Sequence, residues 1–122
     1  MTDEATVVTG LEPRAFWAHF EALTRIPRPS RAEEPVIEHV RAWAAEHDFE
    51  LHQDSGRNLV LRVPATRGRE TALVVALQGH LDMVCERDPS SPNDPAAGRI
   101  VLMRDGDWLR ADGTTLGADD GV

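Results

Sequence analysis

Two short stretches of the sequence carry residue types suited to binding a metal ion. The first is Gln78-Gly79-His80-Leu81-Asp82, which directly follows the apolar run at residues 71–77. A neutral imidazole nitrogen of His80 can bind a metal, and Asp82 projects to the same side of an extended segment. Asp82 can hold the other ring nitrogen, which fixes the tautomer and raises the basicity of the ligand. The same spacing also fits a strand-end histidine that is simply paired with a nearby carboxylate.

The second stretch is glycine-rich and lies near the end of the chain, with the sequence GTTLGADDG at residues 113–121. Its glycines permit unusual backbone dihedrals and close backbone approach. A carboxylate held there, such as that of Asp119, has two oxygens and can bridge two cations. Aspartate and glycine are also the commonest residues of surface turns, so this stretch alone fits a turn equally well.

Other catalytic motifs are missing from the sequence. It contains no His-Glu-x-x-His motif, phosphate-binding loop or dinucleotide fingerprint. None of its serines has the context of a nucleophile elbow. Cys85, the single cysteine, is interpreted as a small apolar residue, and it has no second cysteine in the sequence to pair with. A reduced, cytoplasmic setting is therefore expected.

The charge balance argues against nucleic-acid and membrane partners. The net charge is −8, with 13 basic and 21 acidic residues, and this balance repels phosphate backbones and anionic lipid surfaces. The longest apolar run, residues 72–77, is too short to span a bilayer. The acidic start of the chain lacks the apolar stretch that is typical of a signal peptide.

Helical periodicity is confined to the first half of the chain. Apolar residues at helical spacing predict a helix over residues 13–25, preceded by a loose tail at residues 1–10. A second helix is predicted to end near His47. Ser30 and Glu33 fit a capping box at its start, although Pro35 favours a start nearer residue 33 or 34.

The remaining pattern is typical of β structure. Short strands are predicted at residues 49–53 and 59–63, and a hairpin joins residues 100–103 to 108–111. The apolar run at residues 71–78 suits a central strand that is buried on both faces. The order of elements predicts an α/β fold in which two helices pack on a mixed β-sheet.

The two metal-type motifs, in this order, resemble those of the cytosolic non-specific dipeptidases, also called aminoacyl-histidine dipeptidases. This family lies within the clan of dinuclear-zinc peptidases that includes aminoacylase and carboxypeptidase G. The likeness also covers Ile26-Pro-Arg-Pro-Ser30 and Asp105-Gly-Asp-Trp108, and so extends over nearly the whole chain. The sequence departs from the family at Asp120, where asparagine is typical.

The resemblance implies a function and a set of roles. His80 is expected to bind one zinc ion, Asp119 to bridge two, and Asp82 to act in the catalytic site by orienting His80. Cobalt or manganese are alternatives to zinc. Residues 1–122 are expected to form an incomplete N-terminal portion of the catalytic domain, inactive alone, because the family's general-base glutamate and remaining ligands lie further along the chain.

The implied parent protein is a homodimeric hydrolase that acts on small peptides. Two other interpretations remain open. In the first, the protein belongs to the same clan but is an N-acyl amino acid deacylase. In the second, it is a non-catalytic binding module.

Overall fold

The computed structural model describes residues 6–119, which form two helices followed by four short strands. The helices are α1 (Arg14–Thr24) and α2 (Glu34–Glu46). The strands are β1 (Glu50–Gln53), β2 (Leu59–Arg62), β3 (Leu102–Asp105) and β4 (Trp108–Ala111). The predicted α/β class is confirmed. Both helices and the strands β1, β2 and β4 lie where the sequence predicts them, and β3 begins two residues later than the predicted residues 100–103.

The two helices bury narrow apolar stripes. In α1, Phe20 is 7% exposed and packs inward, whereas Phe16, one turn earlier on the same side of the helix, is about half exposed. In α2, Val36 and Ile37 are almost fully buried. Burial of such side chains contributes about 1.5–3 kcal/mol each. Pro35 lies in the first turn of α2, where its missing N–H removes no hydrogen bond of the helix.

Each pair of strands is an isolated antiparallel hairpin. In β1–β2, Glu50 pairs with Arg62, and the connecting turn is closed by hydrogen bonds between Asp54 and Asn58. In β3–β4, Leu102 pairs with Ala111. The predicted single mixed sheet is therefore wrong for the described residues, because the two hairpins form separate two-stranded sheets.

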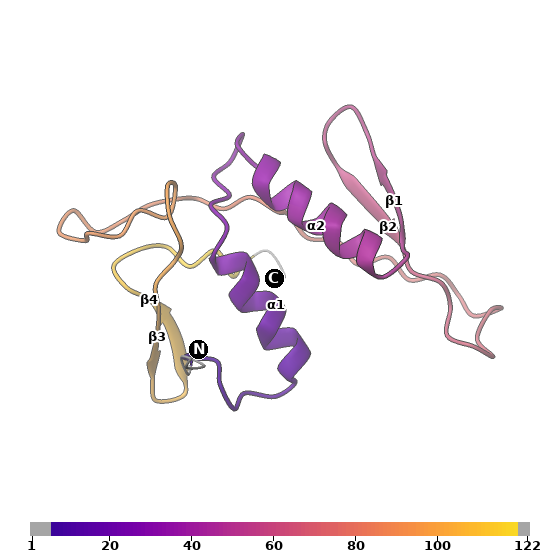
Figure 1. Ribbon diagram of the computed structural model, residues 1–122, viewed down its shortest axis with the longest axis horizontal. Helices are drawn as coiled ribbons and strands as arrows, with labels where there is room; N and C mark the ends of the chain where they lie inside the picture. The colour runs from indigo at the N-terminus through magenta and orange to yellow at the C-terminus, as the bar shows by residue number, and fades with distance from the viewer. Residues whose placement is uncertain (1–5, 120–122) are drawn as a thin grey trace.

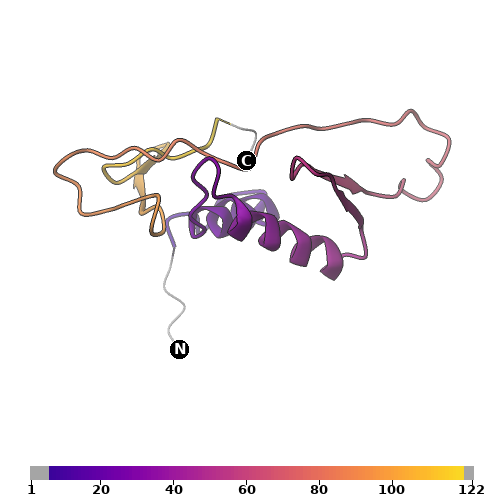
Figure 2. The same cartoon turned by 90° about the horizontal axis from the view of Figure 1, so that it is seen from above.

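The helices separate the two hairpins. The β1–β2 hairpin lies beside α2 and the β3–β4 hairpin lies towards the other side of the molecule (Figure 1). Viewed from above, the helices form one layer, and extended segments that follow β2 and β4 run along the other (Figure 2). Neither helix has the length and apolar character needed to cross a membrane, considering the described residues alone.

The apolar run at residues 71–78 differs most from its prediction. It is extended but forms no strand, and Leu73, Val74 and Leu77 are 94–97% exposed. A strand is buried on both faces only when neighbouring strands and covering layers are present. Residues 6–119 supply no strand hydrogen-bonded to this run, so its apolar side chains face solvent.

The predicted loose tail differs in part as well. Residues 6–10 form a turn in which the Thr9 amide donates to the Thr6 carbonyl over 2.9 Å. Val8 is 8% exposed and joins the small core. Residues 1–5 lie outside the described part of the chain.

Candidate metal site

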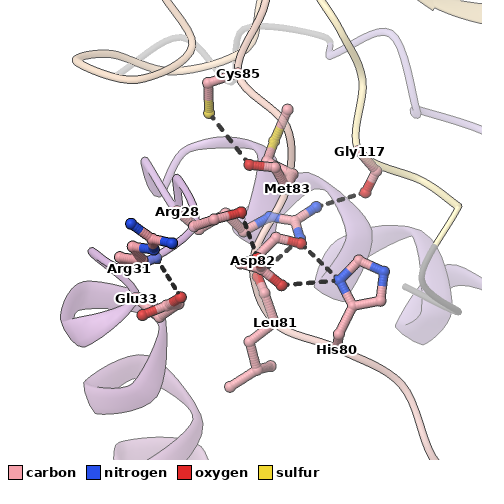
Figure 3. A network of polar contacts seen from close by, with 10 residues as sticks. Arg28, Arg31, Glu33, His80, Leu81, Asp82, Met83, Cys85 and Gly117 are labelled. Atoms are coloured by element: carbon pink, nitrogen blue, oxygen red, sulfur yellow. Dashed lines mark hydrogen bonds and ion pairs between the residues drawn. The ribbon is translucent and has the colours of Figure 1, made fainter.

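His80 and Asp82 form the hydrogen-bonded pair that the first motif predicts. His80 Nδ1 lies 3.0 Å from Asp82 Oδ1 and 2.9 Å from the Asp82 carbonyl oxygen (Figure 3). Both oxygens are acceptors, so Nδ1 carries the proton and donates it. In the neutral ring, this tautomer leaves the lone pair on Nε2, the nitrogen that would bind a metal.

The second oxygen of the Asp82 carboxylate is held by Ser30. Ser30 Oγ donates to Asp82 Oδ2 over 2.5 Å. This hydrogen bond is the main reason that the pKa of Asp82 is lowered, with partial desolvation opposing it and His80 adding to it. The carboxylate is thereby kept ionised and fixed in orientation.

The predicted capping box is wrong, and this contact explains why. The Ser30 hydroxyl is directed to Asp82, and α2 begins with Glu33 at its N-cap and no side-chain cap. The Glu33 carboxylate accepts instead from the Arg31 amide over 2.6 Å. A serine three residues before a glutamate signals a cap only when nothing distant competes for its hydroxyl.

Backbone hydrogen bonds place the second motif alongside the first. The Asp88 amide donates to the Gly113 carbonyl over 2.8 Å, and the Thr115 amide donates to the Glu86 carbonyl over 3.0 Å. The Thr115 hydroxyl donates to the Val84 carbonyl over 2.7 Å. The segment that leaves His80 and the segment that leads to Asp119 therefore run side by side.

His80, Asp82 and Asp119 line a common pocket between these segments, with a volume of about 350 Å³. Ser30 lies at its wall, and residues 115–118 complete the side that belongs to the second motif. The structure thus brings together all three residues that the sequence predicts for the site. Asp120, where the sequence departs from the family, lies outside the described residues.

Arg28 is a residue of this site that the sequence reasoning missed. Its side chain is buried, at 2% exposed, and lies between the two motifs (Figure 3). Nη1 donates to the Leu81 carbonyl over 2.9 Å, and Nη2 donates to the Gly117 carbonyl over 2.6 Å. The local signal was slight: an arginine between two prolines, directly after a helix.

The donor set fits zinc in kind but not in number. Imidazole nitrogen and carboxylate oxygen are both zinc ligands, and catalytic zinc takes about three protein ligands per ion plus an open position. Among residues 6–119, no group of three or more His, Cys, Asp or Glu side chains is gathered closely enough to hold a metal ion. A catalytic zinc site here would therefore need further ligands from outside the described residues.

Cys85 lies close to the first motif but has the properties of a packing residue. Burial is the main cause that raises the pKa of its thiol, with the Arg28 charge opposing it. A raised pKa lowers the thiolate fraction at neutral pH, and the thiolate is the form that attacks or binds metals. The interpretation of Cys85 as a small apolar residue fits this environment.

The described residues thus form an α/β unit that presents an oriented imidazole and a second carboxylate to one pocket. Over 112 residues the chain is 40% identical to the cytosol non-specific dipeptidase of Escherichia coli (strain K12), a match covering 92% of this chain and 23% of that protein. It is also similar to the crystal structure of aminoacylhistidine dipeptidase from Vibrio alginolyticus, with a TM-score of 0.88 and 35% identity.

These similarities confirm the resemblance that the two motifs predict. The structural match covers 98% of this chain and 24% of the Vibrio protein, so the chain spans about a quarter of the length of either relative. No protein-family model matches the chain.

Proposed function

We propose that this chain forms part of a metal-dependent dipeptidase, with His80 and Asp119 as metal ligands and Asp82 as the residue that orients His80. The observation that carries the proposal is the Asp82–His80 hydrogen bond, which leaves Nε2 as the metal-binding nitrogen in a pocket that Asp119 also lines. The names of the two similar proteins, both dipeptidases, support peptide hydrolysis as the reaction.

Each of the three residues has a definite task. Asp82, ionised and held by Ser30, keeps the proton of His80 on Nδ1. His80 then offers a neutral, fixed Nε2, and Asp119 offers two carboxylate oxygens that can bridge neighbouring cations. When bound, a pair of zinc ions supplies a Lewis acid and a water of lowered pKa.

We take the identity of the metals, the substrate, the general base and the oligomeric state from the family resemblance. The metals are two zinc ions, for which cobalt or manganese can substitute, and the substrate is a small peptide. The general-base glutamate and the remaining ligands belong to residues outside the described ones. The active protein is a cytoplasmic homodimer.

The test uses a full-length protein that carries this chain. Chelator treatment should abolish hydrolysis of a histidine-containing dipeptide, and added zinc should restore it. His80→Ala and Asp119→Ala should each remove nearly all activity, whereas Asp107→Ala, in an exposed turn of the β3–β4 hairpin, should not. Turnover in the Asp119 variant equal to that of the parent would rule out a bridging role for this carboxylate.

Assays of the same full-length protein also distinguish the competing functions. An N-acyl amino acid deacylase would cleave an N-acetyl amino acid faster than a dipeptide of similar size. A binding module would show no metal-dependent hydrolysis of either compound.

A further inference from the structure

We infer that Arg28 is a positioning residue that sets the separation of the two metal-binding motifs. Its guanidinium group donates to backbone carbonyls of both loops, and it acts on the two motifs through that backbone. The inference rests on the proposed function, because it assigns Arg28 a role in metal binding at that same site.

The guanidinium group joins the two motifs through different nitrogens. Nη1 donates to the Leu81 carbonyl over 2.9 Å and lies 3.4 Å from the Asp82 carbonyl, so it holds the turn that carries His80. Nη2 donates to the Gly117 carbonyl over 2.6 Å, two residues before Asp119. A planar guanidinium fixes the angle between its donors, so the two loops are held at a set distance.

The backbone of Arg28 is anchored to the same place as its side chain. The Met83 amide donates to the Arg28 carbonyl over 3.0 Å, and Pro29 forms a parallel bridge with Met83. Ser30 adds its hydrogen bond to Asp82. Residues 28–30 therefore hold the first motif along its length, and the Arg28 side chain reaches across to the second.

Gly117 is packed directly against this contact. Its φ is +67°, and a Cβ atom at this position would lie 3.0 Å from Arg28 Nη2 and 2.7 Å from Met83 Sδ. A side chain at position 117 would therefore collide with Met83 and crowd the guanidinium, and the positive φ also favours glycine. The glycine and the arginine together define how near the Asp119 loop lies to His80.

The burial of Arg28 indicates that this contact is specific. A guanidinium on a residue that is 2% exposed has lost nearly all of its hydration, and the carbonyls that accept from Nη1 and Nη2 offset part of that cost. Lysine can replace it only in part, because a single ammonium nitrogen on a flexible stem fixes the distance between two loops less firmly.

The experiment measures metal affinity and fold stability separately in the full-length protein. Arg28→Gln, Arg28→Lys and Gly117→Ala are compared with Arg25→Gln, an exposed arginine only three residues away that is paired with Glu21. Zinc affinity is measured by competition with a chelator, thermal unfolding is followed without metal, and the visible spectrum of bound cobalt reports ligand geometry.

We expect Arg28→Gln to weaken zinc binding by about 10–100-fold, as for other outer-shell partners, and to alter the cobalt spectrum. Arg28→Lys and Gly117→Ala should show the same change to a smaller extent, and Arg25→Gln none. If Arg28→Gln does not fold, the two milder variants decide. A lowered unfolding temperature with parental zinc affinity and cobalt spectrum would overturn the inference and leave Arg28 a purely structural residue. A parent that binds no zinc would instead refute the proposed function.

Discussion

The Asp82 carboxylate links Ser30 to His80 through two hydrogen bonds. One carboxylate oxygen accepts from Ser30 and the other from His80, so the side chain cannot rotate without breaking a hydrogen bond. Such outer partners fix the ring orientation of a metal-binding histidine and raise its basicity. The quality of His80 as a ligand thus depends on residues that do not touch the metal.

Substitutions of Asp82, which accepts from His80, and of Ser30, which holds Asp82, should therefore have graded effects. Asp82→Ala removes the acceptor for Nδ1, and we expect a loss of about 10–100-fold in metal affinity or activity. Ser30→Ala leaves the carboxylate present but free to rotate, so its loss should be smaller. Metal titration of both variants in the full-length protein checks the order.

The matched control for this series is Ser90→Ala, which removes a similar serine–carboxylate hydrogen bond, to Asp88, away from the pocket. Its metal affinity should equal that of the parent. An Asp82→Ala variant with the metal affinity of the parent would contradict the orienting role assigned to the carboxylate.

The helices and hairpins could be predicted because their signals are local. The α1 and α2 stripes follow a period of 3.6 residues, and the turn at residues 54–58 is marked by its own Asp, Gly and Asn. His80, Asp82 and Asp119 were predicted by residue type and motif. Each of these signals lies within a few residues of the feature that it predicts.

The features that were missed depend on distant parts of the chain. Ser30 was assigned to a cap because its partner Asp82 is 52 residues away, and Arg28 is buried only because two loops close around it. The run at residues 71–78 has the composition of a buried strand, but burial requires partners that residues 6–119 do not contain. The composition of a segment indicates which structure it favours, but that structure forms only when the rest of the molecule supplies the packing partners.

The extended run at residues 73–77 is expected to behave differently in two contexts. In the 122-residue chain by itself, its amides should exchange with solvent rapidly, because no neighbouring strand accepts them. In a full-length protein, paired on both sides, they should exchange slowly. Hydrogen-exchange mass spectrometry on both proteins measures this, with the buried α2 turn around Val36 as the internal reference. Equal, rapid exchange in both would show that the run is not a strand in either.

In the described part of the chain, the extended run at residues 73–77 has no layer on either face. Leu73 and Val74, which point to opposite sides of an extended segment, are 94% and 97% exposed. The helices lie to one side of the extended segments that follow β2 and β4 (Figure 2). Complete small domains have a stability of only about 5–15 kcal/mol, so loss of a covering layer removes a large share of it. Contiguous exposed apolar surface of this kind also promotes association.

The 122-residue chain expressed alone should therefore bind a hydrophobic dye and elute as aggregates from a size-exclusion column. Replacing Leu73 and Leu77 with serine should reduce both effects without altering the helices, because both side chains are almost fully exposed. If the unsubstituted 122-residue chain is monomeric, unfolds cooperatively and binds no dye, it is a self-sufficient domain. That result would favour the binding-module interpretation.

The shared metal site is tested most directly by locating the metal itself. Anomalous diffraction at the zinc edge, from crystals of a zinc-loaded full-length protein, identifies the ion and its ligands together. We predict an anomalous peak at about 2.0–2.2 Å from both His80 Nε2 and an Asp119 carboxylate oxygen, with Asp82 on His80 Nδ1. Zinc peaks that contact neither residue, or that contact His80 while Asp119 lies beyond bonding distance, would contradict a shared site.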